Sequence, residues 1–191
     1  MKAVLLDGSR KGENELEGIR DVITKELEEL RWEVEVLELR NLKMTPCTGC
    51  FNCWVKMPGI CIYNDDARGV TKKIVQSDLM VFITPLTFGG HSSVLKCALD
   101  RSLGIVLPYF RGIDGKTHHK KRYKRYPRLM AVGILPVPDA EAEGIFHELV
   151  SRNAINAHSP SYTSEVFVKD TDKKEVERII KHNLNEIEVA A

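Results

Sequence analysis

Four cysteines with the spacing C-x2-C-x2-C-x7-C stand close together in the first third of the chain: Cys47, Cys50, Cys53 and Cys61. Four thiolates can hold a 4Fe–4S cluster, and close CxxCxxC spacing lets one loop supply three of the ligands. The same sulfurs can hold a tetrahedral Zn²⁺, although zinc sites more often pair two CxxC units from separate turns. Free thiols are a third alternative. The spacing favours an iron–sulfur cluster, and the zinc and metal-free alternatives stay open.

Two other segments have the composition of ligand-binding turns. Residues 7–15, DGSRKGENE, combine glycines, a hydroxyl and backbone amides that can cradle a phosphate at the start of a helix. Residues 84–93, TPLTFGGHSS, place flexible glycines among apolar side chains that can lie against a flat heteroaromatic ring. The alternative is two ordinary turns, capped by Asn14 and Ser92. We interpret His91 as a loop histidine rather than a general acid.

The elements that must position these segments alternate along the chain. Apolar runs and period-two patterns predict strands at 3–6, 32–36, 79–84, 129–135 and 162–168. Helical spacing predicts helices at 16–30, 66–77, 92–103, 139–153 and 172–187, the fourth capped by Asp139. Strict alternation indicates a parallel sheet covered on both faces. We therefore predict one three-layer α/β domain over 1–191, doubly wound and flavodoxin-like, with strand order 2-1-3-4-5. Ligands then bind at the loops after the first and third strands.

Two long loops interrupt this pattern, at 41–64 and 108–128. The first holds the cysteine cluster, within which we interpret Trp54 as an anchor. The second carries eight basic and one acidic side chain between 111 and 128, although the whole chain has a net charge of only +1. We interpret it as a solvated, partly disordered insertion. It could also attract an acidic electron-transfer partner or a nicotinamide phosphate. No nucleic-acid module surrounds it, so nucleic-acid binding is disfavoured.

The compartment and the fifth cysteine can also be predicted. The polar start of the chain lacks a secretory signal, and no apolar run reaches the roughly 20 residues that cross a bilayer. We expect a cytoplasmic protein whose thiols stay reduced. Cys97, between Leu95 and Leu99 on a helical face, is expected to be a small core residue.

Three stretches within residues 3–101 resemble a known family, in the family's order. GSRKGENEL resembles the phosphate loop of NAD(P)H-dependent FMN reductases, and ITPLTFGGHSSVLKCALDR resembles their second flavin loop. The segment CTGCFNCWVKMPGIC, followed by Asp65 and Asp66, resembles the iron–sulfur flavoproteins.

The resemblance implies an FMN-binding electron-transfer protein. It implies a phosphate site at Ser9, Arg10 and Asn14, and a flavin-ring site at Pro85, Leu86, Thr87, Phe88 and Gly89. It further implies a 4Fe–4S cluster on the four cysteines, a nicotinamide cofactor or electron-carrier protein as partner, and a homodimer or homotetramer. No side chain need act as acid or base, so no catalytic residue is named.

The chain departs from the family pattern in three places, one of which is the absence of the proline that follows the serine of the phosphate loop. Glu15 replaces a threonine, and its carboxylate would repel a phosphate unless it turns outward. Pro136-Val137-Pro138 replaces the glycine turn that makes a third flavin contact, so that contact is not carried over. These departures leave a second hypothesis open: a cofactor-free, flavodoxin-like binding protein with a structural zinc site made of the four cysteines.

Overall fold

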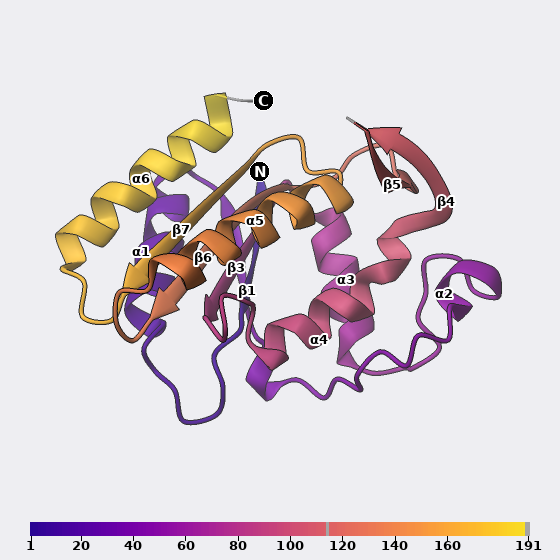
Figure 1. Cartoon of the computed structure of the whole chain (residues 1–191), viewed down its shortest axis with the longest axis horizontal. Coiled ribbons are helices and arrows are strands. Elements are labelled where there is room, and N and C mark those ends of the chain that lie inside the picture. The colour runs from indigo at the N-terminus through magenta and orange to yellow at the C-terminus, as the bar shows by residue number, and fades with distance from the viewer. Residues whose placement is uncertain (114, 190–191) are drawn as a thin grey trace.

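Strands and helices alternate as the apolar pattern predicts, and five parallel strands form the central sheet (Figure 1). The computed structural model describes residues 1–113 and 115–189. The sheet has the order β2-β1-β3-β6-β7, made of Glu33–Glu38, Lys2–Asp7, Leu79–Pro85, Arg128–Leu135 and Tyr162–Val168. Counted without the two strands that lie outside this sheet, the order is 2-1-3-4-5. The predicted flavodoxin-like fold is confirmed.

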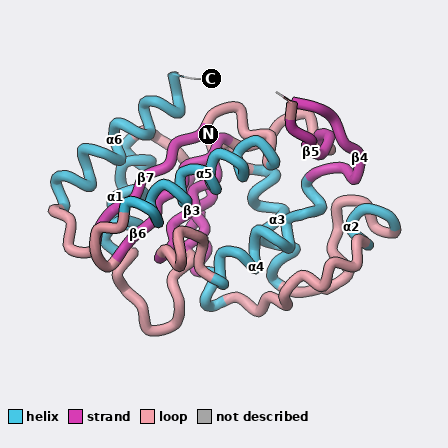
Figure 2. The backbone as a smooth tube through the Cα atoms, viewed as in Figure 1, coloured by secondary structure: helices cyan, strands magenta, loops and turns pink. Residues whose placement is uncertain are grey.

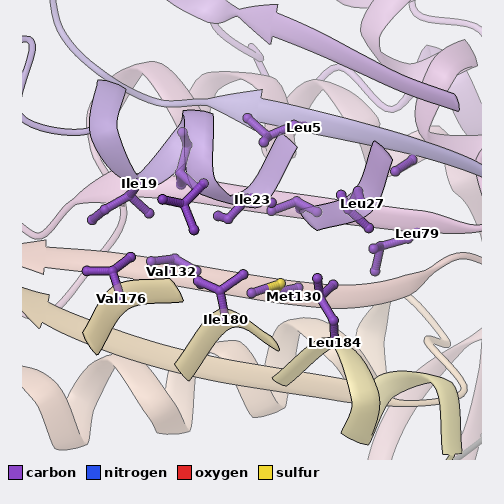
Figure 3. Close-up of a cluster of buried hydrophobic side chains, with 14 of the residues drawn as sticks. Leu5, Ile19, Ile23, Leu27, Leu79, Met130, Val132, Val176, Ile180 and Leu184 are labelled. Carbon is purple, nitrogen blue, oxygen red and sulfur yellow. The ribbon is translucent and has the colours of Figure 1, made fainter. Parts of the chain in front are cut away.

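Helices cover both faces of the sheet. Helices α1 (Glu17–Glu29) and α6 (Lys173–Val189) pack on one face, where their apolar side chains meet those of β1, β3 and β6 (Figure 3). The other face is covered by α3 (Asp66–Gln76), α4 (Ser93–Arg101) and α5 (Ala140–Asn156). The central strands are buried on both faces, which explains why they read as continuous apolar runs.

Side-chain caps begin four of the described helices, with Asp172 capping α6 through the N–H groups of Lys174 and Glu175. The carboxylate of Asp139 accepts hydrogen bonds from two backbone N–H groups at the start of α5, as predicted. Ser92 caps α4 through the N–H of Leu95, and Asp65 caps α3. Helix α1 begins after Leu16 without a side-chain cap, so the alternative of Asn14 as its N-cap is wrong.

The basic segment is a β-hairpin, which corrects the prediction of an unstructured loop at 108–128. Strands β4 (Val106–Ile113) and β5 (Lys116–Lys121) pair antiparallel and project beyond the ends of α4 and α5 (Figures 1 and 2). Residue 114 of the predicted loop lies outside the described residues. Asp-Gly between two extended runs is a hairpin signal, and the density of basic residues masked it.

The cysteine segment, 41–64, is mostly irregular, with one short helix, α2 (Asn52–Val55). Trp54 anchors it to the hairpin, because its indole Nε1 donates to the carbonyl of Val106 at 3.0 Å. Its ring lies between those of Phe51 and His119. Within the described part of the chain, no helix combines the length and apolar character needed to cross a bilayer.

Candidate functional site

The loops after β1 and β3 are tied together at the carboxyl end of the sheet. The backbone N–H of Gly8 donates to the carbonyl of Ile83 at 2.8 Å, and the hydroxyl of Ser92 donates to the carbonyl of Gly8 at 2.6 Å. A Cβ at Gly8 would lie 2.9 Å from both the Ser92 hydroxyl and the Cβ of Leu95. Only glycine lets the two loops approach this closely.

Ser9 shapes the start of the first loop and is turned away from solvent. Its hydroxyl and its backbone N–H both donate to Oδ1 of Asp7, at 2.5 and 2.9 Å. Asp7 is itself buried and pairs with Arg20 at 3.2 Å. The structure therefore uses both donors of Ser9 within the protein.

Glu13 places a carboxylate in the middle of the first loop. It accepts a hydrogen bond from the backbone N–H of Arg10 at 3.0 Å, and the Arg10 guanidinium lies 3.4 Å from its other oxygen. The same guanidinium donates to the Thr87 hydroxyl at 2.6 Å, linking this loop to the second one. These donors already bind an anionic group, so they suit a phosphate that displaces the Glu13 carboxylate.

Glu15 turns out of the loop. Its carboxylate pairs with Lys169, just beyond β7, at 2.8 Å. The charge that would repel a phosphate is therefore directed elsewhere and neutralised. Asn14 lies between these glutamates. With its amide oriented to suit its neighbours, it donates to the carboxylate of Glu17 and to the carbonyl of Glu13.

The second loop forms a tight turn with an exposed aromatic side chain at its tip. Thr87 and Gly90 exchange backbone hydrogen bonds at 3.0 and 2.9 Å, with Phe88 and Gly89 at positive φ between them. The Phe88 side chain is 97% exposed. A Cβ at Gly89 would lie 2.6 Å from the Cβ of Ile145, so the turn packs directly against α5.

The residues before that turn hold it on the sheet. Pro85 is the last residue of β3, and the backbone N–H of Leu86 donates to the carbonyl of Ile134 at 3.0 Å. The side chain of Leu86 fills the space above Gly133, where a Cβ would lie only 2.8 Å from it. The backbone here is thus held by two neighbouring residues of β6, Gly133 and Ile134.

His91 lies beneath the turn and stays neutral. Burial, and to a lesser degree Lys96, lowers its pKa to about 4. Its ring makes edge contacts with Phe82 and Phe146, and its Nε2 pairs with the amide nitrogen of Asn153 at 2.8 Å. A neutral, buried imidazole supports the loop and is unsuited to donate a proton at neutral pH.

The four clustered cysteines line one small cavity of about 20 Å³ together with Arg101. Burial raises the pKa of Cys53, and the charges of Cys61, Cys47 and Cys50 raise it further. Across residues 1–113 and 115–189, no group of three or more His, Cys, Asp or Glu is close enough to hold a metal ion as it stands. The four cysteines line one cavity but, among the described residues, are not gathered into a metal site.

Asp65 and Arg101 fasten both ends of the cysteine segment to α4. Arg101 is fully buried and bonds both oxygens of Asp65 at 2.8 Å each. The guanidinium also donates to the carbonyls of Thr45 and Tyr63. Burial raises the pKa of Asp65, but hydrogen bonds from Arg101 and Thr45 outweigh that effect and lower it to about 2.

Cys97 does not lie in the core as expected. It is half-buried, and its Sγ lies 4.0 Å from the carbonyl of Met44 at the start of the cysteine segment. The helix face that carries it is covered by this irregular segment, which excludes solvent less completely than a strand does.

The structure brings most of the predicted residues together, but it adds three that sequence reasoning missed. Arg10 and Thr87 meet directly, and the four cysteines share one cavity. Glu13, Asp65 and Arg101 were not singled out as functional, because a charged side chain in a loop or at a helix end usually faces solvent. Asp65 and Arg101 are partners 36 residues apart, and Glu13 is tied to the second loop only through Arg10, which also bonds Thr87.

Comparisons with known proteins identify the family of the chain. A family model for NADPH-dependent FMN reductases matches residues 1–117. Iron–sulfur flavoproteins of Archaeoglobus fulgidus and Methanocaldococcus jannaschii are 32% and 34% identical to the chain over 102 and 103 residues. Each alignment covers 53% of this chain, and 49% and 52% of the relatives. The chain thus spans about half the length of the curated relatives it matches.

Solved structures show the same fold at low sequence identity. An NAD(P)H:quinone oxidoreductase from Methanothermobacter marburgensis superposes with a TM-score of 0.71 at 14% identity, covering 95% of this chain and 96% of that one. An FMN-dependent NADH-azoreductase from Bacillus anthracis, solved in complex with FMN, has a TM-score of 0.60 at 12% identity and covers 100% and 98%. Because the family model matches more than half of its residues, the chain belongs to the NADPH-dependent FMN reductase family.

Proposed function

We propose that this protein is an FMN-dependent oxidoreductase that takes electrons from a reduced nicotinamide cofactor and passes them to an acceptor. The observation that carries the proposal is the anion site in the first loop, where Arg10 holds the Glu13 carboxylate beside Thr87. Family membership supports the same reading. When bound, FMN supplies the hydride and single-electron chemistry.

The protein's own residues bind and orient the cofactor. The backbone N–H and guanidinium of Arg10, together with the Asn14 amide, would hold the phosphate. Ser9 would keep the loop in shape through Asp7. The ring would lie against the second loop, formed by Pro85, Leu86, Thr87, Phe88 and Gly89. No acid or base is assigned, since the neutral His91 only supports the turn.

We further propose that Cys47, Cys50, Cys53 and Cys61 bind a 4Fe–4S cluster that relays single electrons to a carrier protein. Their shared cavity supports this. Two relatives are named iron–sulfur flavoproteins. Cluster binding requires the exposed Cys47 and Cys50 to close over the half-buried Cys53 and Cys61.

We also propose a homodimer or homotetramer in the cytoplasm, where thiols remain reduced. Large apolar side chains are well exposed on the cysteine segment and on the adjoining hairpin, among them Val55 at 72%, Tyr109 at 64%, Phe110 at 60% and Phe51 at 51%. Exposed apolar side chains gathered on neighbouring segments are typical of interaction surfaces.

The decisive experiment is cofactor and metal analysis of anaerobically purified protein. We expect a flavin spectrum that NADPH or NADH bleaches, together with iron and acid-labile sulfide. Cys47→Ser should lose iron and keep FMN, whereas the matched control Cys97→Ser should keep both. Light scattering on the same preparation gives the oligomeric state, and a monomer would refute the proposed assembly.

The outcomes separate the proposals. A colourless protein that takes up no FMN would refute the oxidoreductase function. Flavin without iron in intact, anaerobically purified protein would refute the proposed cluster but not the proposed FMN binding. Zinc without iron or flavin would favour a cofactor-free binding protein with a structural four-cysteine zinc site.

A further inference from the structure

A cavity of about 390 Å³ lies between α3, the cysteine segment and the end of the hairpin. No residue of the two flavin loops lines it, so it is distinct from the proposed FMN site. It also shares no lining residue with the larger cavity, of about 440 Å³, between α4, α5 and the hairpin. Its volume lies near the lower end of the range for small-molecule sites, which favours a compact ligand.

Close backbone contacts hold the wall of this cavity together. A Cβ at Gly104, which follows α4, would lie 3.2 Å from the backbone of Gly59 in the cysteine segment. The backbone N–H of Gly59 donates to the carbonyl of Cys53 at 2.8 Å. On its other side, a Cβ at Gly59 would lie 3.3 Å from the hydroxyl of Tyr123, just beyond β5. The cavity is therefore a packed feature that three separate segments build.

Two cations in the wall have no acidic partner within the described residues. Arg68 is half-buried, and its guanidinium donates to the carbonyls of Cys61 and Ile62 at 2.8 and 3.2 Å. It also donates to the side-chain oxygen of Asn64 at 3.1 Å. These three acceptors are neutral, so they leave the charge unbalanced and use only three of the five N–H donors. Lys72, one turn later on α3, is exposed and has no ion pair in the same part of the chain.

The rest of the wall favours an anion with an apolar body. The lining contains no aspartate or glutamate among the described residues, and its third cation, Arg101, is already paired with Asp65. Apolar surface comes from Ile60, Val75 and the ring of Tyr123. Unbalanced positive charge beside apolar side chains is the combination that binds an organic anion.

We propose that this cavity binds a compact aromatic carboxylate, whose anionic end pairs with Arg68 and Lys72 and whose ring lies against the apolar part of the wall. Hydrogen bonds between a guanidinium and a carboxylate are stronger than those between neutral groups. Cys53 and Cys61 line both this cavity and the small cysteine cavity, so the ligand would lie beside the proposed iron–sulfur cluster. Its binding requires no electron transfer and can be tested separately from the proposed function.

The test compares two probes of nearly equal size on the anaerobically purified full chain with FMN bound: 2-naphthoate, which is charged, and 2-naphthamide, which is not. Equilibrium dialysis at low salt should show 2-naphthoate binding about tenfold more tightly. This preference should shrink in about 0.5 M salt, which screens the charges.

Variants of two adjacent lysines assign the preference to the cavity. Lys72→Gln should reduce it about threefold, as expected for one exposed ion pair. The matched control Lys73→Gln should leave it unchanged, because Lys73 pairs with Glu35 and does not line the cavity. Ile60→Ala, which shortens the apolar wall at a side chain that is 52% exposed, should weaken both probes by a similar factor.

Lysine acetylation followed by mass spectrometry locates the probe on the wild-type protein. 2-Naphthoate should protect Lys72 and leave Lys73 as reactive as before. The proposal would be overturned by equal affinity for the two probes, by a preference that Lys72→Gln leaves intact, or by acetylation of Lys72 that 2-naphthoate does not slow. Because this protection needs neither a variant nor electron transfer, it decides the binding even if the proposed flavin or cluster is absent.

Discussion

The bond between Asp65 and Arg101 should dominate the stability of the cysteine segment. Asp65→Asn removes the negative charge but keeps the shape, which leaves a fully buried guanidinium without its counter-ion. Breaking one side of a buried ion pair costs about 3 kcal/mol. Lowering the pKa of Asp65 from 3.8 to about 2 corresponds to about 2 kcal/mol of stability from the same group. We therefore expect a loss of about 2 to 3 kcal/mol at pH 7.

The stabilisation by Asp65 should decrease as the pH falls. Because the folded pKa lies below the unfolded one, Asp65 stabilises the fold fully above about pH 4 and loses that contribution as pH falls through 2. In urea unfolding of the cofactor-free protein, the difference in unfolding free energy between wild type and Asp65→Asn should therefore be about half as large at pH 3 as at pH 7.

A matched control separates this pair from surface charge in general. Asp100→Asn removes a neighbouring carboxylate that pairs with Lys96 on the exposed face of α4, and it should cost less than about 0.5 kcal/mol. Asp65 positions the Arg101 guanidinium, which in turn holds the Tyr63 carbonyl close to Cys61. Without that carboxylate the segment around Cys61 should open more often, so Cys61 should react faster with a thiol reagent in Asp65→Asn than in the control. The reasoning would be refuted if Asp65→Asn lost no more unfolding free energy than Asp100→Asn. It would also be refuted if the difference in unfolding free energy between wild type and Asp65→Asn did not change with pH.

Two further predictions concern the flavin loops. Glu13→Gln should tighten FMN binding about three- to fivefold in a fluorescence titration, because an exposed charge interaction contributes up to about 1 kcal/mol. The control Glu15→Gln should change FMN affinity little, because the carboxylate of Glu15 faces Lys169. Equal effects of the two substitutions on FMN affinity would argue against the anion site. Gly89→Ala should lower the unfolding free energy by about 2 kcal/mol, through positive φ and a clash with Ile145, whereas Gly12→Ala, with positive φ but open space, should cost about 1 kcal/mol. Equal losses in thermal or urea unfolding would show that the contact with α5 is unimportant.

The architecture was predictable because it depends on short-range patterns. Apolar runs at β1, β3 and β6 mark strands buried on both faces, and the stripe in α1 marks a helix packed on one side. Alternation of such elements leaves few topologies. Strand β7 was predicted to its ends, and Asp139 was placed as a cap from its position alone.

The hairpin and the charged anchors were not predictable in the same way. In β4 and β5 the pairing joins Phe110 to His119 and Arg111 to His118, and no local period records that register. Loop 41–64 has no regular period, and nothing in it reveals that the adjoining Asp65 bonds a buried arginine on α4. Such partners are found only when the chain is folded, because their sequence separation exceeds any local pattern.

The residue types alone specified a parallel α/β sheet, two glycine-containing loops at its carboxyl end and a cluster of four thiols. Tertiary structure decided how those parts meet: Ser92 bonding Gly8, Arg10 reaching Thr87, and Glu15 turning to Lys169. It also formed a largely apolar cavity between α4, α5 and the hairpin. Backbone periodicity follows from neighbouring residues, whereas the partner of a charge and the walls of a cavity follow from packing of distant elements.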